Sequence, residues 1–108
     1  MRVYIAGPYT KGDVAVNVRN AIEAANQLMD HGHFPFIPHL NHFVHLLFPR
    51  PYEDWLALDN VFLPYCQALV RLPGESLGAD KEVMLAKSLN IPVYAGVGDL
   101  LCKEGNGR

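Results

Sequence analysis

A hydroxyl, a glycine and a carboxylate recur at short spacing in the segment LPGESLGADKEVMLAKSLNIPVY, residues 72–94. Ser76, Gly78 and Glu82 have the spacing S-x-G-x-x-x-E and follow an apolar run that ends at Pro73. Ser76 is well placed to cap a helix, whose first amides are unpaired and carry a partial positive charge. Glu82 would then lie roughly 9 Å further along the helix axis. The pattern indicates either an anion cradle beside a reactive carboxylate or an ordinary helix cap.

The rest of the chain must supply the elements that position this segment. Apolar runs and apolar periodicity predict strands alternating with helices. We expect strands at 2–7, 34–38, 67–72 and 91–97, helices at 14–30, 39–48, 53–63 and 77–89, and a loose tail at 103–108. This order predicts one α/β domain over residues 1–108, a small doubly wound (Rossmann/flavodoxin-like) parallel sheet of four to five strands with helices on both faces.

Doubly wound sheets bind ligands at the carboxyl ends of their strands. The loops after the first three predicted strands therefore converge on one edge, and the helix at 53–63 can lean into it. The residues that this arrangement brings together are Gly7, Pro8, Tyr9, Thr10, His39, Asp59, Ser76, Gly78 and Glu82. We expect the Thr10 loop and Ser76 to bind a phosphate, and His39 to contact sugar or phosphate.

Composition excludes several classes of function. The formal charge is −2 and the cations are scattered, which argues against duplex nucleic acid as a partner. No apolar run is long enough to span a membrane, and the N-terminus does not read as a secretion signal. The two cysteines form no C-x-x-C pair, which favours reduced thiols in a cytoplasmic protein.

Cofactor and metal motifs are also missing from the sequence. Neither the P-loop pattern nor G-x-G-x-x-G is present, so we expect no cofactor. His39, His42 and His45 step by three residues and drift around a helix, and we therefore expect no metal site.

Four segments of the chain resemble the nucleoside 2-deoxyribosyltransferase superfamily. They are VYIAGPYT (3–10), FIPHL (36–40), WLALDNVFLPYCQALVRLP (55–73) and SLGADKEVMLAKSLNIPV (76–93). The resemblance covers about residues 2–95 and is closest to the small 2′-deoxynucleoside 5′-phosphate N-hydrolase-like proteins. The sequence departs from the family at Gln67, where an aspartate is common, and in its short loop Thr10-Lys11-Gly12.

The resemblance implies an N-glycosidase that acts on a nucleoside 5′-monophosphate. Glu82 matches the glutamate that attacks the anomeric carbon, and Asp59 matches the aspartate that assists it, in the retaining scheme of glycosidases. Transferases of the superfamily carry aspartate at the position of Ser76, and a hydroxyl accommodates a phosphate where a carboxylate repels it. Tyr9 is expected to bond Glu82 and restrain it.

Two other functions stay open at this point: a deoxyribosyltransferase that exchanges bases, and a non-catalytic nucleotide-binding module. The sequence does not decide the base or whether the sugar is ribose or 2′-deoxyribose. The run HLNHFVHLLF (39–48) has more apolar side chains than one helix face can bury. We therefore expect a homodimer or higher homo-oligomer built from residues 39–63, with the alternative that this helix is buried within the monomer.

Overall fold

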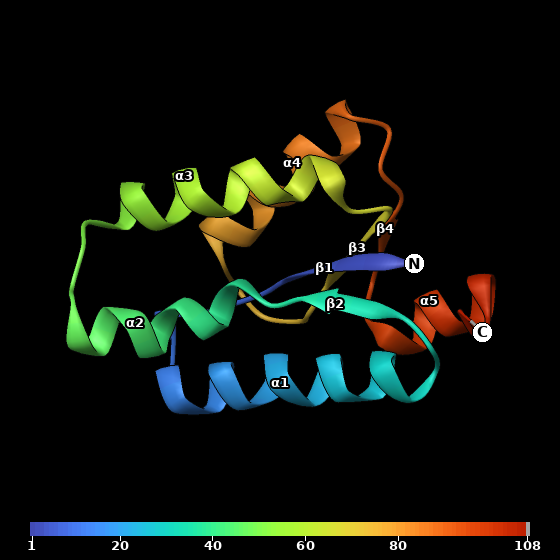
Figure 1. Cartoon of the computed structure of the whole chain (residues 1–108), viewed down its shortest axis with the longest axis horizontal. Helices are drawn as coiled ribbons and strands as arrows, with labels where there is room; N and C mark the ends of the chain where they lie inside the picture. The colour runs from blue at the N-terminus through green and yellow to red at the C-terminus, as the bar shows by residue number, and fades with distance from the viewer. Residues whose placement is uncertain (108) are drawn as a thin grey trace.

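In the computed structural model, which describes residues 1–107, four short strands form one parallel sheet between two layers of helices (Figure 1). The elements in chain order are β1 (Arg2–Ala6), α1 (Val14–Asp30), β2 (Phe34–Phe36), the 3₁₀ turn η1 (Pro38–Leu40), α2 (Asn41–Leu47), α3 (Tyr52–Phe62), the 3₁₀ turn η2 (Leu63–Tyr65), β3 (Ala68–Arg71), α4 (Leu77–Ser88), β4 (Val93–Tyr94) and α5 (Val97–Glu104). The strand order is β2-β1-β3-β4. The predicted fold class is confirmed.

β1 is a central strand that pairs with β2 on one side and β3 on the other. Tyr4 lies opposite Phe36 of β2 and Leu69 of β3, and all three pairings in the sheet are parallel. Because every strand runs in the same direction, the loops that follow β1, β2 and β3 leave the sheet at one edge.

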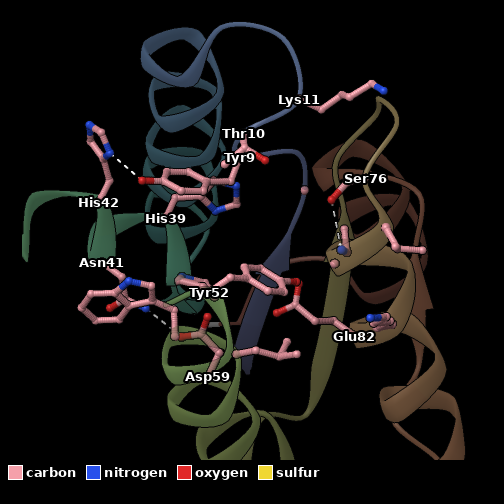
Figure 2. A pocket seen from close by; sticks show the side chains of 18 of the residues that line it. Tyr9, Thr10, Lys11, His39, Asn41, His42, Tyr52, Asp59, Ser76 and Glu82 are labelled. Carbon is pink, nitrogen blue, oxygen red and sulfur yellow. Dashed lines mark hydrogen bonds between the residues drawn. The ribbon is translucent and has the colours of Figure 1, made fainter. Parts of the chain in front are cut away.

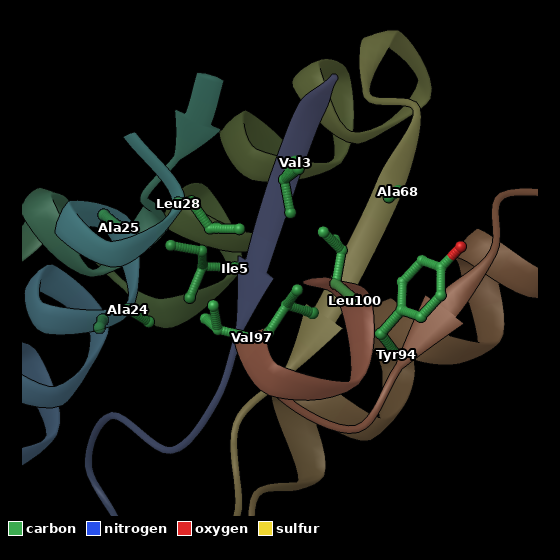
Figure 3. Close-up of a cluster of buried hydrophobic side chains, with 11 residues drawn as sticks. Val3, Ile5, Ala24, Ala25, Leu28, Ala68, Tyr94, Val97 and Leu100 are labelled. Carbon is green, nitrogen blue, oxygen red and sulfur yellow. The ribbon is translucent and has the colours of Figure 1, made fainter. Parts of the chain in front are cut away.

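Alternation along β1 divides the core between the two faces of the sheet. Val3 and Ile5 face α1 and α5, where they pack in a cluster that includes Leu28 and Leu100 (Figure 3). Tyr4 and the residues that share its face pack against η2 and α4. Each strand is therefore covered on both sides, as expected for a parallel sheet.

The helix α1 begins and ends as its sequence predicts. The side chain of Asp13 accepts a hydrogen bond from the amide of Val16, which caps the first turn. Gly32, just after the last turn, has φ of +79°, a conformation that favours glycine. The apolar stripe of α1 faces the sheet. The helix therefore fixes the loop that connects β1 to it at the carboxyl edge of the sheet.

The C-terminal part differs from the prediction of one strand over 91–97 and a loose tail from 103. β4 has only two residues, because the chain turns at Gly96 (φ +121°) and the side chain of Asp99 accepts a hydrogen bond from the amide of Ala95. The helix α5 follows, and its apolar residues pack on the sheet. An apolar run alone does not distinguish a strand from the start of a buried helix.

Residues 105 and 107 are also bound to the domain. The imidazole of His33, which is buried, donates from Nε2 to the carbonyl of Gly105 and accepts from the amino group of Met1. The amide of Gly107 donates to the carbonyl of His31. The expected tail is therefore anchored as far as Gly107, and Arg108 lies outside the described residues.

None of the helices within residues 1–107 combines the length and the apolar character needed to cross a membrane.

Candidate active site

A cavity of about 430 Å³ opens at the carboxyl ends of the strands. It is bounded by the loop after β1, by η1 and α2, by α3 and by the first turns of α4 (Figure 2). The predicted site residues that line it are Gly7, Tyr9, Thr10, His39, Asp59, Ser76, Gly78 and Glu82. The structure thus brings together every predicted site residue except Pro8.

Glu82 lies in the second turn of α4, whose start is capped as predicted. The hydroxyl of Ser76 accepts a hydrogen bond from the amide of Ala79 at 3.1 Å. The carboxylate of Glu82 accepts a hydrogen bond from the hydroxyl of Tyr4, a fully buried residue of β1. Burial raises the pKa of Glu82 to about 7, while the Tyr4 hydrogen bond and the charge of Arg71 oppose this rise.

Asp59 is another carboxyl group that lines the cavity. It is the buried residue of α3, with only 8% of its surface exposed. Burial raises the pKa of Asp59 to about 6, and a hydrogen bond from the side-chain amide of Asn41, at 2.9 Å, opposes this rise. The charge of Asp59 also raises the pKa of Glu82, so the two carboxyl groups interact. Such a pair suits acid–base chemistry better than a merely structural role.

The tyrosine that bonds Glu82 was predicted wrongly. Tyr9 lines the cavity, but its hydroxyl lies 2.7 Å from Nδ1 of His42, and Tyr4 holds Glu82 instead. The strand period contains the missing signal. Val3 and Ile5 point to the α1 face, so Tyr4 points to the opposite face, which α4 covers.

Pro8 and Gly7 help to build the edge of the sheet. Pro8 lies outside the large cavity, and its carbonyl accepts a hydrogen bond from His39 at 3.0 Å. A Cβ at Gly74, which has φ of +114°, would meet the Pro8 ring at 2.8 Å. A Cβ at Gly7 would meet the side chain of Leu72 at 2.9 Å. These close contacts pack the loops after β1 and β3 against one another.

His39 is 6% exposed, and burial lowers its pKa, which favours the neutral imidazole. Its Nε2 donates to the carbonyl of Pro8, so Nδ1 carries the free lone pair. Nδ1 has no hydrogen-bond partner among the described residues. An unpaired buried acceptor is costly, which favours a ligand that supplies a donor near this side chain.

Aromatic and imidazole rings form the wall of the cavity on α2 and α3. His42 packs edge-on against Tyr9, and His45 accepts a hydrogen bond from the indole of Trp55 at 3.0 Å. Tyr52, at the start of α3, reaches across the cavity toward α4 (Figure 2). Rings in this position can stack on a flat heterocycle. Of these residues, the sequence had indicated a role in the site only for Tyr9, and it had pointed to His42 and His45 only to reject a metal site.

Arg71, at the end of β3, positions the segment that carries Ser76. Its guanidinium donates to the carbonyls of Leu72 and Gly74 and pairs with Asp80 at 3.0 Å. The sequence reading missed this role, since an arginine after an apolar run gives no indication of its partners. Within residues 1–107, no cluster of three or more histidine, cysteine or acidic side chains has a metal-binding arrangement.

The fold and the cavity define an α/β protein with two interacting carboxyl groups, one buried and one partly buried, at the carboxyl edge of its sheet. The chain belongs to the family described as Domain of unknown function (DUF7768), which matches residues 1–95. A comparison with curated proteins finds no match.

The fold is similar to a solved enzyme structure. This is the 2-deoxyribosyltransferase of the psychrotolerant bacterium Bacillus psychrosaccharolyticus, described as a biocatalyst for the synthesis of antiviral and antitumoral nucleosides. The TM-score is 0.61 and the identity is 19%, over 87% of this chain and 70% of that one. The fold of this chain is therefore similar to that of a 2-deoxyribosyltransferase.

Proposed function

We propose that the protein hydrolyses the N-glycosidic bond of a (deoxy)nucleoside 5′-monophosphate and releases the free base and a sugar 5-phosphate. The observation that carries this proposal is a pair of carboxyl groups, the partly buried Glu82 held by Tyr4 and the buried Asp59 held by Asn41, in one cavity at the carboxyl ends of the strands. The fold likeness to a 2-deoxyribosyltransferase supports the same chemistry.

The reaction would proceed in two displacements. The carboxylate of Glu82 attacks the anomeric carbon, the C–N bond breaks, and the base leaves with the bond electrons and a proton from Asp59. A water molecule then attacks the same carbon, gives its proton to the carboxylate of Asp59, and releases Glu82 from the sugar.

The two pKa values bear on this mechanism in different ways. A pKa of about 6 keeps part of the Asp59 population protonated near neutral pH, as a proton donor requires. Burial raises the pKa of Glu82 to about 7, so part of its population is the carboxylate that a nucleophile requires near neutral pH, and the hydrogen bond from Tyr4 and the charge of Arg71 favour this form. Because the groups titrate close together, the productive state with one proton on Asp59 is expected over a narrow pH range.

A transferase is the second candidate, and the structural likeness to the Bacillus psychrosaccharolyticus enzyme favours it. In that case an acceptor base replaces water in the second displacement. Both reactions use the same glycosyl-enzyme on Glu82.

A panel of nucleosides and their 5′-monophosphates, incubated with the protein and analysed for free base, tests the proposal. We expect base release from at least one monophosphate. We also expect the monophosphate to bind roughly 10- to 100-fold more tightly than its nucleoside, since charge-assisted hydrogen bonds from Ser76 and the Thr10 loop contribute about 1.5–3 kcal/mol. Equal affinity, with base exchange in place of base release, would favour the transferase.

The substitution Ser76→Asp tests the source of this preference. Aspartate is as good a helix cap as serine, so α4 should remain folded, but its charge repels a phosphate. We expect the variant to lose the preference for the monophosphate and to retain affinity for the nucleoside, as measured by calorimetry. Ser76→Thr, which keeps the hydroxyl, is the matched control.

We further propose that the protein is a homodimer or a larger homo-oligomer. No residue of α2 is buried, which argues against the alternative that this helix is enclosed within the monomer. The apolar patch, defined by its exposed members, consists of Leu40, Phe43, Val44, Leu46, Leu47 and Phe48. A second copy that covers this patch would also lie near the cavity, because His42 and His45 of the same helix line it.

Light scattering at micromolar concentration measures the assembly. We expect at least a dimer mass for the wild type and a monomer mass for Leu47→Asp, since a charge at a buried interface is strongly unfavourable. Met84→Asp, at an equally exposed apolar residue of α4, controls for the added charge. A monomeric wild type with full activity contradicts both the interface and a shared site.

The free cysteines Cys66 and Cys102 are consistent with the cytoplasmic location that we also propose.

A further inference from the structure

Tyr52 spans the opening between α3 and α4. It is the first residue of α3, it lines the cavity, and 51% of its surface is exposed to solvent. Figure 2 shows its ring lying between the α3 helix, which carries Asp59, and the α4 helix, which carries Glu82. Neither the fold nor the reaction proposed above gives this side chain a role.

The hydroxyl of Tyr52 rests against Gly78 of α4. A Cβ built on Gly78 would collide with this hydroxyl, whereas the next ring atom, Cζ, lies at 3.6 Å, an ordinary contact distance. Gly78 is not in a left-handed conformation, so its backbone does not require glycine. The absence of a side chain at this position is therefore explained by the space that the Tyr52 hydroxyl occupies.

Helix geometry places this contact on the same helix faces as the two carboxyl groups. Gly78 and Glu82 are four residues apart on α4 and share a face. Tyr52 and Asp59 are seven residues apart, two turns of α3, and also share a face. The ring thus crosses from one helix to the other on the solvent side of both carboxyl groups, and the charges of Glu82 and Asp59 both act on its hydroxyl.

We propose that Tyr52 is a positioning residue whose side chain covers the Glu82–Asp59 pair, and that this cover is held in place by packing against Gly78. The cover keeps water from the two carboxyl groups in the unliganded protein. When a ligand reaches the two carboxyl groups, the Tyr52 ring swings outward. The ring can move because it is half-exposed, and in the unliganded protein its contact with Gly78 holds it across the cavity. The role rests on the proposed function only in that it concerns the same two carboxyl groups.

Desolvation is the largest cause of the raised pKa values of both groups, which supports a cover. The other groups that face Glu82 are the hydroxyl of Tyr4 from β1, the carboxyl of Asp59 from α3 and the guanidinium of Arg71 from β3. Lys81, next to Glu82 on α4, also lines the cavity. Removing the Tyr52 ring leaves all four in place, so a fall in the pKa of Glu82 would report the loss of the cover.

Four variants separate the ring from its hydroxyl. Gly78→Ala displaces the ring from its contact with residue 78, Tyr52→Ala removes the ring, and Tyr52→Phe keeps the ring without the hydroxyl. The double variant Gly78→Ala/Tyr52→Phe lets the ring return, because only the 3.6 Å contact to Cζ remains. Gly98→Ala is the matched control, since Gly98 is likewise the second residue of a helix and a Cβ there meets nothing within 4 Å.

The measurement is the pKa of Glu82 in the unliganded protein, followed by carboxyl-carbon NMR. We expect values near that of the wild type for Tyr52→Phe, for Gly98→Ala and for the double variant. We expect a fall of at least one pH unit for Tyr52→Ala and for Gly78→Ala. An unchanged pKa in Gly78→Ala, or a double variant that stays low, overturns the proposal.

This experiment separates the cover from the reaction. If the pKa pattern appears but no nucleotide of the panel is cleaved, the cover stands and the proposed function fails. If the wild type releases base but the pKa of Glu82 does not fall in Tyr52→Ala and Gly78→Ala, the function stands and the cover is refuted.

Discussion

The variant Glu82→Gln is expected to release no measurable base from any nucleotide that the wild type cleaves. Glutamine has the same shape and can still accept the hydrogen bond of Tyr4, but its amide cannot attack the anomeric carbon. Loss of the nucleophile in a two-step mechanism removes several orders of magnitude of rate, because the remaining groups cannot form the intermediate. Free base is measured by chromatography after a long incubation.

The fold of this variant is checked by circular dichroism, and Glu23→Gln serves as the control. Glu23 is an exposed carboxylate of α1 outside the cavity, so its replacement should leave base release unchanged. Release at near wild-type rate from folded Glu82→Gln would contradict the assignment of the nucleophile.

The same substitution is expected to stabilise the protein at alkaline pH. A carboxyl group whose pKa is raised on folding favours the folded state at a pH below its unfolded pKa, and this contribution is lost as the pH rises through the folded pKa. For Glu82 this contribution is therefore lost between about pH 4.5 and about pH 7. A rise in pKa from 4.5 to about 7 corresponds to roughly 3 kcal/mol of stability, which the glutamine variant does not lose because its side chain carries no charge.

Thermal unfolding at pH 4 and at pH 8.5 measures this effect. At pH 8.5 we expect Glu82→Gln to melt roughly 10 °C above the wild type, whereas at pH 4 the two should melt together. Asp59→Asn should behave in the same direction, since burial also raises the pKa of Asp59. Glu23→Gln should show no such dependence on pH. A variant that is less stable than the wild type at pH 8.5 would show that the Glu82 carboxylate is not held at an energetic cost.

The residues that follow strands were predictable from the sequence, whereas the contacts between them were not. Ser76 caps α4 and Glu82 lies in the cavity because helix starts and strand ends follow local rules. Asn41 donates to Asp59 from 18 residues away, and Arg71 binds the nearby carbonyls of Leu72 and Gly74 and the carboxylate of Asp80, but no sequence pattern indicates these partners. Tyr4 was missed for a different reason. Its sequence context is that of a core residue, and the hydrogen bond from its hydroxyl to Glu82 depends on the packing of α4 over β1.

The errors near the C-terminus have a similar origin. The run IPVYAGV has the composition of a buried strand, but only Val93 and Tyr94 pair with β3. The remainder turns at Gly96 and starts α5. Val97 and Leu100 of this helix pack in the same core cluster as residues of α1. Local composition cannot report how much of a sheet edge is already covered.

The central place of β1 has a consequence for how the chain acquires its structure. Of the four strands of the sheet, β1 is synthesised before the other three, and its two neighbours, β2 and β3, begin 32 and 66 residues after its own first residue, Arg2. Until residues 68–71 have emerged from the ribosome, one edge of β1 remains unpaired and its apolar side chains lack half of their cover. Productive folding should therefore be a late and all-or-none event in synthesis, and a nascent chain that stalls before β3 becomes a client for chaperones rather than a stable intermediate.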